Sequence, residues 1–176
     1  MIDFVKKYMR RRSLKKARSK VESGFIPLSQ VHGAVAFIDV EDTSFDQCKN
    51  EMLLFFRRHN IHGELFYFDF RKLGDGERLI TSINGTVLKK DLNWFDRPSD
   101  EKINVMLDGD PELFISVLDS TDYPIEYMAK ASTAKFKIGR RQLPDNVFDL
   151  VVSDANSPRS EVEVFRLIAS FLEKVS

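Results

Sequence analysis

Five apolar runs of this chain end at an aspartate, a side chain that can ligate a metal ion or cap a helix. The five residues are Asp39, Asp69, Asp91, Asp119 and Asp154. Helix-like stretches follow most of them, and strands that alternate with helices are typical of an α/β domain with a largely parallel sheet. In such a sheet a ligand is expected at the carboxyl ends of the strands. Carboxylates gathered there would hold Mg²⁺ through their oxygens. The alternative is that each aspartate caps the helix or turn that follows it.

One of these sites carries a more specific pattern. The segment Asp39-Val40-Glu41-Asp42-Thr43 resembles the Asp-x-Asp-x-Thr signature of haloacid-dehalogenase-type phosphatases. The resemblance implies a hydrolase in which Asp39 attacks phosphorus, Glu41 acts as general acid and Mg²⁺ is the cofactor. Later motifs of that family would fall on Ser116, Lys135 and Asp154. The pattern departs from the family in three ways: Glu41 replaces the second aspartate, Ser116 is predicted inside its strand, and a single acid follows the last strand.

Other site chemistry is poorly represented in the sequence. Neither G-x-G-x-x-G nor G-x-x-x-x-G-K-[ST] occurs, which disfavours a dinucleotide-binding site or a P-loop NTPase. One cysteine, Cys48, and three histidines do not make a zinc site of usual spacing, so no resident metal is predicted apart from Mg²⁺ in the hydrolase hypothesis. A third hypothesis places a nucleotide or sugar phosphate at the strand ends, bound by Asp119, Ser120 and Arg140.

Two basic tracts stand out, Lys89 to Phe95 and Ala134 to Arg141. Lys90 and Trp94 are ligand candidates because an indole can stack on a base or sugar ring. The alternative is that Trp94 and Phe95 both cover the end of the core. The charges around Arg140 would suit a phosphate group or, alternatively, an exposed edge strand.

With the basic first helix and the strand ending at Asp39, these tracts resemble an uncharacterised family of small bacterial α/β proteins, a domain of unknown function. That resemblance implies a compact α/β fold and no catalytic residue. Residues 113–139 are also similar, at the level of the fold, to the N-terminal half of heptosyltransferase-type glycosyltransferases.

The elements that would position these residues follow from the apolar spacing. Strands are predicted at 31–40, 62–70, 86–90, 113–118, 134–138 and 148–152, and helices at 2–20, 42–60, 98–109 and 123–131 and from 157 to the C-terminus. Ser44 and Gln47 have the spacing of a capping box. The prediction is a three-layer, Rossmann-like sandwich whose mostly parallel sheet has five or six strands. It forms one domain, residues 25–176, preceded by a basic helical arm, residues 1–24.

Charge is distributed unevenly along the chain. Residues 1–24 hold nine Lys or Arg and two acids, a net charge of +7, and the remaining 18 basic and 25 acidic residues give −7. Such an arm can bind an anionic partner, namely RNA, an anionic membrane surface or an acidic protein, and it can also lie on its own body or on a second copy in a homo-oligomer. No run reaches the ~18 apolar residues of a membrane span, and no signal peptide is recognised, so a cytoplasmic location is expected. The leading hypothesis is a non-catalytic binding protein that uses the arm, the Trp94 region or both.

Overall fold

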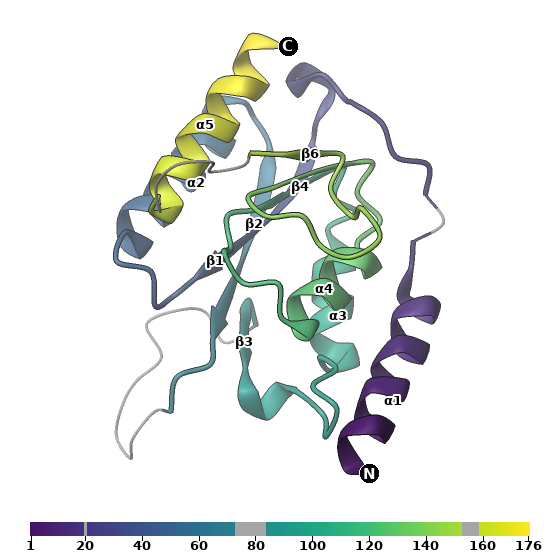
Figure 1. Cartoon of the computed structure of the whole chain (residues 1–176). Helices are drawn as coiled ribbons and strands as arrows, with labels where there is room; N and C mark the ends of the chain where they lie inside the picture. Colours follow the sequence, from purple (N-terminus) through teal and green to yellow (C-terminus); the bar gives the residue numbers. More distant parts are fainter. Residues whose placement is uncertain (20, 73–83, 153–158) are drawn as a thin grey trace.

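The computed structural model describes residues 1–19, 21–72, 84–152 and 159–176. Within them, six strands form one parallel sheet in the order β3-β2-β1-β4-β5-β6 (Figure 1). The strands are Gly33–Asp39 (β1), His62–Asp69 (β2), Thr86–Leu88 (β3), Leu113–Ser116 (β4), Phe136–Gly139 (β5) and Leu150–Val151 (β6). The α-helices are Ile2–Ala17 (α1), Phe45–Arg58 (α2), Asp100–Asp108 (α3), Tyr123–Ala131 (α4) and Glu161–Lys174 (α5), and two short 3₁₀ helices, Leu28–Gln30 and Lys89–Asp91, precede β1 and α3. The predicted α/β fold with a parallel sheet is confirmed.

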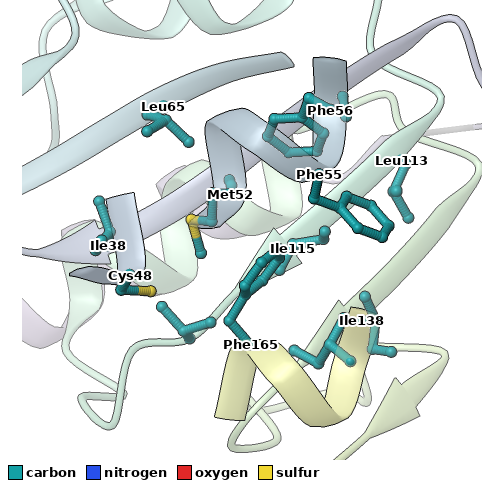
Figure 2. Packing of buried hydrophobic residues seen from close by; sticks show 14 of the residues in the cluster. Ile38, Cys48, Met52, Phe55, Phe56, Leu65, Leu113, Ile115, Ile138 and Phe165 are labelled. Carbon is teal, nitrogen blue, oxygen red and sulfur yellow. The ribbon is translucent and has the colours of Figure 1, made fainter. Parts of the chain in front are cut away.

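The sheet is buried on both faces, which explains why its central strands have continuous apolar runs instead of an apolar–polar alternation. Along β1, Ala34, Ala36 and Ile38 face α2 and α5, whereas Val35 and Phe37 face α3 and α4. On the first face the ring of Phe55 from α2 meets that of Phe165 from α5 edge-on, with centroids 5.7 Å apart (Figure 2). The result is a three-layer sandwich with one apolar core on each face of the sheet, and these cores fix the positions of the strands.

Helix α1 lies outside this sandwich, on the side of α3 and α4 (Figure 1). Three of its side chains, Met9, Leu14 and Ala17, pack against a small third cluster formed by Phe95, Ile103, Tyr123 and Tyr127. The amide of Ser19 then donates to the carbonyl of Lys130 at 3.0 Å. The arm is therefore docked on the body of its own chain.

The predicted capping box at Ser44 is wrong. Ser44 precedes α2, but its side chain caps no amide of that helix. Its hydroxyl instead donates to Asp42 Oδ1 at 2.6 Å and accepts from the amide of Val162, in the first turn of α5, at 3.1 Å. At the start of α5, by contrast, Glu163 reaches back to accept from the amide of Ser160 at 2.8 Å, as in a capping box.

Candidate functional site

The carboxyl ends of β1 and β4 lie side by side at the point where the strand order reverses, the usual ligand position in sheets of this kind. Phe37 of β1 is in register with Ser116, which ends β4, so the prediction that Ser116 lies inside its strand is wrong. Asp39 ends β1 and is half-buried, and its Oδ1 accepts from the amide of Glu41 at 2.8 Å. Burial, reinforced by the acids Glu41, Asp42 and Asp69, raises the pKa of Asp39. Glu41 is exposed.

A buried acid that the sequence analysis missed lies beside Asp39. Glu161 is the first residue of α5 and is only 1% exposed. Its Oε1 accepts from the amide of Asp39 at 2.9 Å, while its Oε2 has no hydrogen-bond partner among the residues that the structure describes. Burial raises the pKa of Glu161 to about 9, so the group is protonated near neutral pH. No local signal distinguishes it from a solvated acid in a first helical turn.

The residues predicted to bind a phosphate at the strand ends are engaged with their own chain. Asp119 accepts from Arg141 Nε at 3.0 Å, and Arg140 Nε lies 3.8 Å from the same carboxylate. These contacts lower the pKa of Asp119, and the hydrogen bond from Arg141 makes the largest contribution. Arg140 is buried and donates to the carbonyl of Arg159, and Ser120 Oγ accepts from the amide of Asp122 at 3.1 Å.

The interpretation of the basic 134–141 tract as an exposed edge strand is wrong. β5 lies between β4 and β6, inside the sheet. Lys137 is buried there, where its Nζ donates to the carbonyl of Ala129 in α4 at 2.7 Å. Burial lowers the pKa of Lys137 to about 8.

The remaining strand-end aspartates have local partners. Asp69 is buried, and both of its carboxylate oxygens accept from Arg71 at 2.8 Å, which lowers the pKa of Asp69. Asp91 accepts from the amide of Leu88 at 2.8 Å. Asp154 lies outside the described residues. Within the described ranges no group of three or more His, Cys, Asp or Glu side chains is arranged to hold a metal ion.

Trp94 and Phe95 have different environments. Phe95 is buried in the third cluster, whereas Trp94 is 57% exposed and meets the Phe95 ring edge-on, with centroids 5.2 Å apart. The alternative in which both rings cover the core therefore holds for Phe95 alone. Lys90, four residues earlier, is exposed.

Two cations of α1 hold the helix on the body. Lys6 Nζ lies 2.8 Å from the carboxylate of Asp96, and Arg10 binds the same carboxylate. Arg10 also donates through Nε to the carbonyl of Phe95 at 3.0 Å, and its guanidinium lies 5.0 Å from the centroid of the Tyr123 ring. Together, Lys6 and Arg10 lower the pKa of Asp96 against the opposing effect of its burial.

A groove with a volume of 1070 Å³ runs between α1, α4 and the loop around Pro144. It is strongly cationic; its charged lining residues are Lys7, Arg10, Arg11, Arg12, Lys15, Arg18, Asp122, Glu126, Lys130 and Asp145. Lys130 is paired with Glu126 and Asp145, at 2.8 and 2.9 Å. Lys7, Arg11 and Lys15 are exposed and form no ion pair with any residue in the described part of the chain. Seven of its ten charged lining residues are basic and three are acidic, so the groove carries a net positive charge.

The model of a family of unknown function, DUF6913, matches residues 3–167. The chain belongs to this family. The match includes both basic tracts on which the resemblance to an uncharacterised α/β family was based, and it runs from α1 into α5. The groove of this DUF6913 protein therefore lies wholly within the family region.

No curated protein and no solved structure matches this DUF6913 chain. Among its described residues, no helix has both the length and the apolar character needed to cross a bilayer.

Proposed function

We propose that this DUF6913 protein is a non-catalytic, cytoplasmic binding protein that holds an anionic partner along α1 and in the adjoining groove. The observation that carries the proposal is the row Lys7, Arg11 and Lys15. Residues four apart lie on one stripe of a helix, about 6 Å from one another. Three exposed cations on one stripe, without an ion-pair partner among the described residues, form a continuous positive wall to the groove.

The docking of α1 supports this reading. Among the described residues, Lys6 and Arg10 alone form ion pairs between α1 and the body, so the helix is docked there without ion pairs from its other cations. The body beyond residue 24 carries a net charge of −7, from 18 basic and 25 acidic residues, yet none of its described acids forms an ion pair with this row. Uncompensated positive charge in a concave surface attracts anions from solution and increases their rate of association.

The test is the triple variant K7Q/R11Q/K15Q, compared with the wild type for binding to three probes: vesicles containing phosphatidylglycerol, a single-stranded RNA oligonucleotide and polyglutamate. The expected result is that one probe binds the wild type and that the variant binds it about a hundredfold more weakly, because each of the three cations near an anionic surface contributes about 1 kcal/mol. Raising the salt to about 0.5 M should weaken wild-type binding as well, since screening is then strong.

A matched control neutralises three exposed cations elsewhere, in R57Q/K135Q/K174Q. This variant has the same net charge as the first but an intact α1, so it should bind like the wild type. Equal losses in both variants would show that net charge, and not the groove, governs binding. Wild-type affinity in K7Q/R11Q/K15Q, or salt-independent binding, would refute the proposal.

A second candidate, the Mg²⁺-dependent hydrolase based on Asp39 and Glu41, is favoured by one observation. Ser116 ends its strand next to β1, as the phosphatase pattern requires. The experiment is a phosphatase screen with Mg²⁺ on the wild type and on Asp39→Asn. Turnover that is abolished by this substitution would replace the non-catalytic proposal, whereas activity equal in both proteins would exclude Asp39 as nucleophile.

A further inference from the structure

The first half of α1 carries large apolar side chains that the described part of the chain leaves exposed. Ile2 is 78% exposed and Phe4 is 77% exposed, and Val5 and Tyr8 are also exposed. The flank of α1 that packs on the body uses different residues, namely Met9, Leu14 and Ala17. Exposed apolar patches of this kind commonly mark an interaction site, because leaving them in water costs free energy.

Trp94, in a loop that contacts α1, is a further large apolar side chain left exposed. Its loop is held beside the first half of α1 by Asp96, which binds Lys6 and Arg10, and its indole is 57% exposed. We call the set Ile2, Phe4, Val5, Tyr8 and Trp94 the apolar tip. The second half of α1 is different in character: Arg11, Arg12, Lys15 and Lys16 are exposed and form no ion pair with any described residue.

We infer that the anionic partner of α1 is a lipid bilayer with anionic headgroups, which the apolar tip enters while the cations bind headgroup phosphates. This inference rests on the proposed function and names its partner. Three members of the tip are aromatic and could stack on nucleobases, but Ile2 and Val5 have no ring to stack, whereas a bilayer accepts aliphatic and aromatic side chains alike. Burial of apolar side chains and attraction of Lys and Arg to anionic headgroups are the two contributions that hold a peripheral helix at a membrane surface.

Charge also determines the orientation of binding. The body has a net charge of −7, and an anionic surface repels it. The exposed side of α1 is thereby directed to the bilayer, with α4 behind it. The helix keeps its contacts with the body, because Arg10 and Met9 lie on the docked flank and not at the tip.

The first experiment uses Trp94, the one tryptophan of the chain, as an intrinsic probe. Its emission is recorded with phosphatidylcholine vesicles, with and without phosphatidylglycerol. The expected result is a blue shift and a higher intensity with the anionic vesicles alone, because the indole leaves water for the headgroup boundary. Vesicle binding with unchanged Trp94 emission would overturn the insertion of the tip.

The second experiment measures co-sedimentation of I2S/F4S with the same anionic vesicles. Both side chains are exposed, so serine should leave the thermal unfolding curve unchanged while binding weakens about tenfold or more. The matched control is L53S/L54S, which removes two exposed leucines from α2 and should bind like the wild type. Wild-type binding by I2S/F4S would refute the inference.

The outcomes separate this inference from the proposed function. The first outcome is that the wild type binds RNA or polyglutamate, that K7Q/R11Q/K15Q loses this binding, and that neither protein binds vesicles. This outcome would support the cationic site and show that the bilayer is the wrong partner. If vesicle binding depends on the cations and is insensitive to I2S/F4S, the bilayer is bound by charge alone and the apolar tip has no part in it. If the triple charge variant binds vesicles as the wild type does, the proposed function fails, whatever I2S/F4S shows.

Discussion

The main-chain amide of Asp39 donates a hydrogen bond of 2.9 Å to Oε1 of Glu161, which joins the end of β1 to the first residue of α5. An acid at a helix start is usually solvated and ionised, where it interacts favourably with the helix dipole. Here the cost of burial outweighs both the dipole and the amide, and the pKa of Glu161 rises to about 9. Asp39 and Asp42 add to the increase, because a negative charge on Glu161 would face theirs. The Glu161 carboxyl is therefore neutral near pH 7, and its contribution to stability depends on pH.

Replacing Glu161 by glutamine should stabilise the protein above pH 4.5, by an amount that grows up to about pH 9. The folded state binds the Glu161 proton more tightly than the unfolded state, whose pKa is near 4.5, so wild-type stability falls as pH rises through this window. Glutamine is neutral throughout and keeps an oxygen for the Asp39 amide. Urea unfolding of both proteins at several pH values should show a gap of a few kcal/mol at the alkaline end.

The control for this experiment is Glu163→Gln, two residues further along α5. Glu163 accepts from Ser160, and its pKa is lowered. Its contribution is present above pH 4.5 and is lost in acid, so this glutamine variant should be less stable than the wild type at neutral pH. A stability gap between Glu161→Gln and the wild type that is constant from pH 4.5 to 9 would show that Glu161 ionises normally.

Lys137→Met should reveal a second pH dependence, of opposite sign. The pKa of Lys137 is about 8 in the folded protein and near 10.5 when unfolded, so the unfolded state holds more protons between these values. Wild-type stability should therefore rise relative to the methionine variant as pH increases from 8 to 10.5, by roughly 3 kcal/mol. Denaturant unfolding of both proteins at several pH values checks this, with Lys135→Met, at an exposed lysine two residues earlier, as the matched substitution.

Gly63→Ala should destabilise the fold by about 1–3 kcal/mol. A Cβ at Gly63 in β2 would lie 2.1 Å from a ring carbon of Phe56, whose side chain is buried in the core beneath α2 (Figure 2). Relief requires movement of the ring or the strand, because the surrounding core is close-packed. Denaturant midpoints measure the loss, and Gly24→Ala, where a Cβ would have open space, should match the wild type. A midpoint for Gly63→Ala equal to that of Gly24→Ala would contradict the packing described.

Asp96→Asn should loosen α1 without unfolding the body. Asp96 has a φ of 67°, a conformation that asparagine also accepts, so the substitution removes the charge and spares the turn. With its ion pairs to Lys6 and Arg10 lost, α1 should exchange its amide hydrogens several-fold faster, in keeping with a partly exposed pair worth up to about 1 kcal/mol.

Asp110→Asn is the control for Asp96→Asn, since Asp110 also has a positive φ, 43°, and forms no ion pair with the described residues. Faster exchange confined to α1 in Asp96→Asn, and absent in Asp110→Asn, is the expected pattern. Equal protection of α1 in all three proteins would show that the apolar contacts of Met9 and Leu14 hold the helix without the charges.

The sequence predicts correctly those features that depend on residues close together in the chain, such as the ends of helices. Helix α4 was predicted at the bounds it has, because Asp122 and Pro124 mark its start locally. The errors concern residues whose partners are distant in the chain. Ser44 was assigned a role in its own helix, yet its hydroxyl accepts from Val162 in α5. The charges on β5 suggested a sheet edge, but pairing with both β4 and β6 places Lys137 in the interior.

Local chain chemistry thus accounts for the α/β class, the parallel sheet and the basic first helix, since apolar runs, caps and charge are properties of short segments. Which of those charges are neutralised, and which remain available, follows from contacts between segments far apart. Lys6 and Lys7 are adjacent, but the packing of α1 turns one toward Asp96 and the other to the groove. Glu161 meets Asp39 across 122 positions, and burial at that contact changes a common surface acid into a protonated one.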